Sequence, residues 1–137
     1  MSTIFQDITD ALNAGVLAVF PTTPIAWENI LYDPIPDTPY VRPTVIVHRS
    51  IPEGLGPSGL IRHSGVLQVS LYYPLGEGML DMLTAGDVVA SALKRGTDLI
   101  SGSAVVRVES VARAMVLYDK AWAHLPITIT WVCFATA

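Results

Sequence analysis

The sequence predicts an α+β fold in which two helices pack on one face of a mainly antiparallel β-sheet. Apolar residues recur at helical spacing in residues 4–18 and again in residues 75–93. In residues 66–73 and 125–133 they instead alternate with a period close to two, which is typical of half-buried strands. Such a mixture of helices and strand runs is typical of two packed layers. We expect the order α-β-β-β-α-β-β-β.

The composition is that of a chain able to bury a sizeable core. Its length of 137 residues suits one domain, and 51% of its residues are hydrophobic while 15% are charged. We therefore expect a single domain over residues 1–137. Apolar runs stay shorter than the roughly 18 residues of a membrane span, and MSTIFQDITD lacks the basic start of a secretory signal. These features predict a soluble, unexported protein.

Charge is distributed unevenly along the chain, whose net charge is −4. The first 41 residues hold five acidic residues and no lysine or arginine. Arg42, Arg49 and Arg62, against Glu53, make the next stretch locally basic. Such asymmetry can orient one copy against another, or it can simply reflect solvated faces. With two lysines in all, the chain lacks the clustered basic surface that sequence-independent DNA binding requires.

The first half of the chain predicts a capped helix followed by proline-rich strands. Thr3 and Gln6 have the spacing of a capping box before a helix over residues 4–18, and Pro21 prevents its continuation. Eight of the ten prolines lie between residues 21 and 57. Short strands at about 25–28 and 40–48 fit between them and suit edge positions. Residues 49–65, RSIPEGLGPSGLIRHSG, are too long and too rich in glycine and proline for a tight turn, so we expect a long flexible loop.

The second half predicts a strand, a second helix and three further strands. From Val66, one set of side chains should face the core and the set between them should face away. The helix after YPLGEG should bury an apolar stripe and end near KRG at residues 94–96. That stripe comprises Leu75, Met79, Met82, Leu83, Val89, Ala90 and Leu93. The next strands are expected at 104–109 and 111–118, and the last one carries Leu125, Ile127, Ile129, Trp131 and Cys133 inward.

The second sheet face is predicted to be neither fully apolar nor fully polar. It should carry Val66, Gln68, Tyr72, Thr128, Thr130 and Val132. A face of this kind is covered either by a neighbouring subunit or by a loop of the same chain, and the sequence leaves both open.

Motifs with catalytic chemistry are weak in this chain. GLGPSG at 54–59 matches a dinucleotide-binding pattern, but neither a strand directly before it nor a helix after it is predicted. His48, His63 and His124 lack metal-ligand spacing, and no metal or cofactor is expected. Cys133 faces inward on an apolar strand and should behave as a small hydrophobic residue. Glu77 and Asp81 suit the start of a helix, where the macrodipole favours acidic groups.

Five segments in the same order carry a family resemblance. They are PIAWEN (24–29), TPYVRPTVIV (38–47), SGVLQVSLYYPLGEG (64–78), LKRGTDL (93–99) and LPITITWVCF (125–134). Together they resemble the small tail-terminator-like proteins of long-tailed, siphovirus-type bacteriophages and prophages. The resemblance covers nearly the whole chain except residues 49–65, and its specificity lies in order and spacing.

The resemblance implies a structural protein of the virion and no enzymatic activity. Such proteins form a ring, typically a hexamer, at the head-proximal end of the tail tube after assembly in the host cytoplasm. The ring ends tube polymerisation and docks to the head connector, while genomic DNA passes through its lumen without specific binding. Expected partners are identical subunits, the tail tube protein and a connector protein, with no membrane. We place Arg49, Glu53, Arg62 and Tyr72 at a subunit or tube interface.

Three alternatives remain open from the sequence. Another neck component, such as a head-completion or stopper protein, would share the same general features. A small-molecule-binding module would use the mixed sheet face with Trp27, Trp122 and Trp131 as a pocket lining. An enzyme would need two of the histidines or acidic residues to converge in a cleft.

Overall fold

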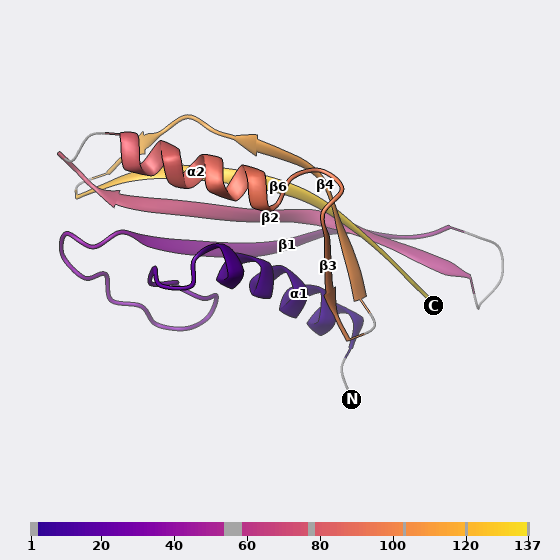
Figure 1. Cartoon of the computed structure of the whole chain (residues 1–137). Coiled ribbons are helices and arrows are strands. Elements are labelled where there is room, and N and C mark those ends of the chain that lie inside the picture. The colour runs from indigo at the N-terminus through magenta and orange to yellow at the C-terminus, as the bar shows by residue number, and fades with distance from the viewer. Residues whose placement is uncertain (1–2, 54–58, 77–78, 103, 120, 137) are drawn as a thin grey trace.

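The computed structural model describes residues 3–53, 59–76, 79–102, 104–119 and 121–136. The observed order is α-β-β-α-β-β-β-β (Figure 1). The elements are α1 (Ile4–Val19), β1 (Tyr40–Pro52), β2 (Leu60–Pro74), α2 (Leu80–Ala92), β3 (Asp98–Ser101), β4 (Ala104–Arg113), β5 (Leu117–Tyr118) and β6 (Trp122–Thr136). The predicted α+β class is confirmed, although the order of its elements differs slightly from the expected one.

The strands form one antiparallel sheet in the order β1-β2-β6-β4-β3, and β5 pairs with β6. The expected strand at 25–28 is wrong, because Ile25 makes only an isolated bridge to Val41 before the chain turns away from the sheet. The break expected between 104–109 and 111–118 is also misplaced. The chain has a β-bulge there, seen as a register shift between Val108 and Ser110, and β4 continues through it to Arg113.

The first helix begins and packs as its sequence predicts. Thr3 is the N-cap, and its Oγ1 accepts a hydrogen bond from the backbone N–H of Gln6 at 3.2 Å. Ile8, Leu12 and Val16 lie on one face and are buried. This spacing fixes which side of α1 meets the sheet.

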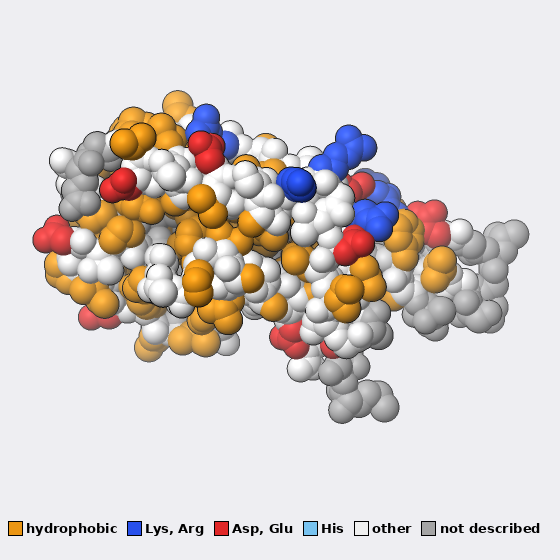
Figure 2. Space-filling model, viewed as in Figure 1, with side chains coloured by type: hydrophobic (Ala, Val, Ile, Leu, Met, Phe, Trp, Pro, Cys, Tyr) orange, Lys and Arg blue, Asp and Glu red, His pale blue; other side chains and the backbone are white. Residues whose placement is uncertain are grey.

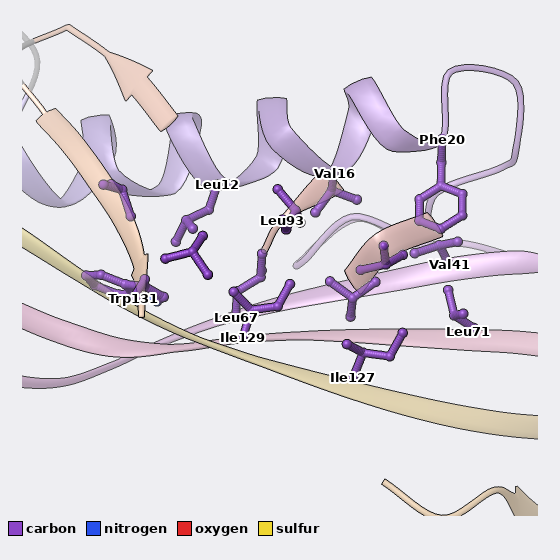
Figure 3. Packing of buried hydrophobic residues seen from close by; sticks show 14 of the residues in the cluster. Leu12, Val16, Phe20, Val41, Leu67, Leu71, Leu93, Ile127, Ile129 and Trp131 are labelled. Atoms are coloured by element: carbon purple, nitrogen blue, oxygen red, sulfur yellow. The ribbon is translucent and has the colours of Figure 1, made fainter. Parts of the chain in front are cut away.

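Both helices cover the same face of the sheet and share one core. In Figure 3, Leu12 and Val16 from α1 point toward Leu67, Ile129 and Trp131 of the sheet. From α2 and the residue after it, Met82, Val89 and Leu93 join the same cluster. The inward residues of β6 are those expected: Leu125, Ile127, Ile129, Trp131 and Cys133, each at most 1% exposed.

The expected stripe on the second helix is only partly correct. Leu75 and Met79 precede α2 and are exposed, and Ala90 lies on its outer side. The chain first has to turn at Gly76, whose φ of +89° lies in the left-handed region that favours glycine. Because this turn delays the helix until Leu80, the buried face is set by residues 82, 86, 89 and 93.

The long loop predicted at residues 49–65 is wrong for most of its length. Arg49 to Pro52 pair with Ile61 to Ser64, so β1 and β2 continue as a hairpin well past the helices (Figure 1). The N–H of Glu53 donates to the carbonyl of Leu60 at 2.8 Å and closes the ladder. Pro52 is tolerated in the ladder because β1 is an edge strand. Residues 54–58, which hold most of GLGPSG, lie outside the described residues.

Candidate assembly surfaces

The sheet face opposite the helices carries a row of stacked aromatic rings. Tyr40, Tyr72 and His124 are opposite one another on β1, β2 and β6, so their side chains share one face. The rings of Tyr40 and Tyr72 are 4.6 Å apart at 6°, and those of Tyr72 and His124 are 4.5 Å apart at 9°. Trp122 meets Tyr40 edge-on at 5.2 Å. We call these four residues the aromatic row.

Burial shifts the pKa values of Tyr40 and His124 within the aromatic row. Desolvation raises the pKa of Tyr40, with a smaller contribution from Tyr72. Desolvation lowers the pKa of His124, and the Arg42 guanidinium acts in the same direction. The guanidinium carbon of Arg42 lies 6.0 Å from the centroid of the Tyr72 ring. The row is therefore an apolar platform with one cation beside it, and its imidazole is favoured in the neutral form.

The second surface is the projecting end of the β1–β2 hairpin, residues 49–53 and 59–64, which we call the hairpin arm. A register shift between Val47 and Arg49 places Arg49 opposite Ser64, and Ile51 lies opposite Arg62. These side chains share the outer face with the exposed Phe134 of β6, the partner of Arg62. The arm thus presents arginine and large apolar side chains together.

Electrostatic partners distinguish the two arginines of the hairpin arm. Arg62 lies 3.7 Å from Glu109 of the β4 bulge. Arg49 is exposed, and it belongs to neither of the ion pairs seen in the described part of the chain. Its charge is therefore the more available of the two for a partner.

The inner side of the hairpin arm is anchored to the first helix. His63 is buried at 5% exposure, its Nδ1 lies 2.8 Å from Ser50 Oγ, and its ring meets Phe5 edge-on at 5.3 Å. Desolvation lowers the pKa of His63. These contacts fix the direction of the arm relative to α1.

The third surface is the segment 21–39, which we call the acidic loop. The N–H of Val45 donates to the carboxylate of Glu28, which ties the loop to the edge of β1. Trp27 and Ile30 contribute to hollows on both sides of the loop, of about 560 Å³ and about 360 Å³. Ile30, Leu31 and Ile35 are 64%, 103% and 52% exposed. Tyr32 reaches across the edge, and its ring lies 5.0 Å from that of Tyr40.

The acidic loop and the hairpin arm lie at opposite ends of the molecule (Figure 1). On the face shown in Figure 2, side chains of lysine and arginine gather mainly toward the end with the arm, while carboxylates lie at both ends. Glu28, Asp33 and Asp37 account for the charge of the loop, which contains no basic residue. The two ends of the fold therefore differ mainly in their cations, which the loop lacks.

The four predicted interface residues divide into two places. Arg49, Glu53 and Arg62 belong to the hairpin arm, whereas Tyr72 lies in the aromatic row. Arg62 and Tyr72 share one strand and one face but are ten residues apart, about 33 Å along a strand. An acidic surface on the first 41 residues was one interpretation of the charge pattern, but the stacking of Tyr40, Tyr72 and His124 was not predicted. The stack becomes apparent only from the register of three strands. The acidic run without lysine or arginine, in contrast, can be read directly from the sequence.

Residues weighed for chemistry are dispersed by the fold. Buried His63 faces the helices while His124 faces the other way, and burial raises the pKa of the Cys133 thiol. The alternative of one pocket lined by three tryptophans is wrong, because Trp131 is buried under the helices and Trp122 is on the opposite face. Glu77 lies outside the described residues. Among those residues, no group of histidine, cysteine and acidic side chains could hold a metal.

These features define an α+β protein whose surface is that of a protein-interaction partner, since clustered exposed apolar residues mark contact sites. The particular family follows from comparison with known proteins. A family model described as phage tail terminator protein matches residues 7–131, and the chain belongs to this family. It is a structural protein of the phage tail.

Two solved structures share the fold. One, which carries only a sequence identifier as its name, is 20% identical with a TM-score of 0.71 and covers 91% of this chain and 94% of its own. The other is a chain from the virion of a native gene transfer agent particle, 16% identical with a TM-score of 0.58 and full coverage of both chains. No curated protein matches. In the described residues, none of the helices has the length and apolarity needed to cross a membrane.

Proposed function

We propose that the chain forms a closed ring of identical copies, six in the form that the family resemblance implies, at the head-proximal end of the tail tube. The ring ends tube polymerisation and offers a docking surface to the head connector. The family match over residues 7–131 carries this proposal. Exposed apolar residues at both ends of the sheet support it, because a subunit within a ring needs two contact surfaces.

Within this proposal, the contacts with a neighbouring subunit or the tube include Arg49, Glu53, Arg62 and Tyr72. The arm projects beyond the helices, and the aromatic row presents rings on the face that the helices leave open. DNA passes through the lumen without specific binding. A net charge of −4 supports this view, since DNA binding of appreciable strength requires clustered cations.

A tube-length assay tests the function. Tail tube protein is polymerised with and without the purified chain, and tube lengths are measured by negative-stain electron microscopy. The chain should shorten and narrow the length distribution and label one end of each tube. Unchanged lengths, with the chain bound instead to purified portal or connector protein, would favour a head-completion or stopper role.

A further inference from the structure

We propose that the hairpin arm of one copy docks on the acidic loop of the next copy, so that the ring closes through one repeated head-to-tail contact. This inference rests on the proposed ring and names the two surfaces that form it. The charges, the exposed apolar residues and the positions of the two surfaces support it independently.

Charge complementarity is the first argument. The acidic loop carries Glu28, Asp33 and Asp37 without any basic residue, and Asp33 and Asp37 are exposed. On the arm, Arg49 is exposed and lies outside both ion pairs of the described residues. Opposite potentials steer and orient an encounter between two copies.

Matching apolar surface is the second argument. The loop exposes Ile30, Leu31 and Ile35, and the arm exposes Ile51 and Leu60 beside Phe134. Beside the loop, the hollow of about 560 Å³ is lined partly by Trp27, Ile30 and Leu31. It offers space for an aliphatic side chain from the arm. Burying these groups supplies free energy that exposed charges alone do not provide.

Geometry is the third argument. Asp33 and Asp37 belong to the part of the loop where Tyr32 lies against Tyr40, and Arg49 is nine residues further along β1, about 30 Å at about 3.3 Å per residue. These two carboxylates are therefore too far from Arg49 to pair with it within one copy. Two different patches at opposite ends of one chain produce a heterologous interface, which repeats from copy to copy and closes into a ring when the rotation permits.

Charge reversal at one residue of each surface provides the test. Arg49→Glu and Asp33→Lys each place like charges across the contact, so each variant alone should need at least a tenfold higher concentration to assemble than the wild type. The double variant R49E/D33K restores opposite charges and should assemble like the wild type. Native mass spectrometry and sedimentation velocity measure the assembled fraction, and circular dichroism verifies that each variant is folded.

Mixing the two single variants gives a more selective readout. Every contact between alternating copies is then complementary, so an equimolar mixture should form rings that neither variant forms alone. Exposed Arg113 on β4 provides the control, since Arg113→Glu changes the net charge equally but should leave assembly unchanged.

Failure of this inference is distinguishable from failure of the proposed function. If the wild type forms rings on tubes and R49E does so at the same concentration, or if neither the mixture nor the double variant recovers, the arm-to-loop contact is wrong while the ring stands. If R49E rings form but no longer bind tubes, the arm contacts the tube instead. If the wild type forms no ring even with tube protein present, the proposed function itself is wrong.

Discussion

Gly65 of β2 lies directly opposite Trp131 of β6 and leaves no space for a side chain. A Cβ at residue 65 would lie 2.9 Å from Cζ2 of Trp131 and would overlap the carbonyl oxygen of Ile46 on β1. This glycine therefore lets three strands approach at the point where the hairpin arm leaves the core. The arm therefore depends on Gly65, which was predicted to lie in a loop because glycine is common in turns.

Gly65→Ala should destabilise the fold by about 3 kcal/mol or more, because neither a buried indole nor a backbone carbonyl can move without cost. Urea unfolding followed by tryptophan fluorescence measures the change. The neighbouring Ser64→Ala, at a half-buried position, is the matched control and should cost less than about 1 kcal/mol. A Gly65→Ala protein as stable as the wild type would contradict the close approach.

Tyr72 should stabilise the sheet through its ring rather than its hydroxyl. Tyr72→Ala removes two stacked contacts, each worth about 0.5–1.5 kcal/mol beyond area burial, so a loss of about 1–3 kcal/mol is expected. Tyr72→Phe keeps both contacts and should stay within about 0.5 kcal/mol of the wild type. Urea titrations of the three proteins give the comparison, and equal losses in both variants would refute the stacking account.

Stability should fall as the pH drops below about 6.5, the usual pKa of an unfolded histidine. Burial lowers the pKa values of His63 and His124 in the folded protein. As the pH falls, the unfolded state therefore binds protons before the folded state does. The stability that is present above about pH 6.5 is lost between that pH and the lowered pKa values of the folded protein. The unfolding free energy measured at pH 7.5 and pH 5.5 should show this loss.

His63→Gln and His124→Gln should each reduce the difference in unfolding free energy between those two pH values. His48→Gln serves as the control, because the side chain of His48 is exposed at the register shift of β1. If His63→Gln and His124→Gln both kept the pH dependence of the wild type, the buried imidazoles would not be its source.

The first helix should depend on its N-cap. Thr3→Ala removes the acceptor for the Gln6 N–H and should cost about 1 kcal/mol, whereas Thr3→Ser keeps the acceptor and most of the stability. Thermal unfolding followed by circular dichroism measures both. An equal loss in the two variants would mean that the hydroxyl does not cap the helix.

Local patterns were enough to predict the core but not the ends of the molecule. The alternation around Leu67 and Ile129 predicts inward side chains, because a strand with one buried face has a strict period of two. The arm was mistaken for a loop because its prolines and glycines are local signals, while the pairing of Arg49 with Ser64 depends on register. Neither the stack on Tyr72 nor the separation of Arg62 from Tyr72 can be inferred without that register.

The acidic loop is a second feature whose position could not be predicted from the sequence. Its charge was visible as a run without lysine or arginine, but its place opposite the arm depends on where β1 begins and on the bond between Val45 and Glu28. The composition of residues 21–39 shows that the loop is acidic, but only the fold shows which surface it forms.

Imaging of the chain together with tail tubes tests the central claim most directly. Electron cryomicroscopy of tubes grown with the wild-type chain should show one closed ring at a single end, with each copy touching the next through different surfaces. Tubes with bare ends, together with a chain that remains a monomer by mass measurement in the same mixture, would contradict the account.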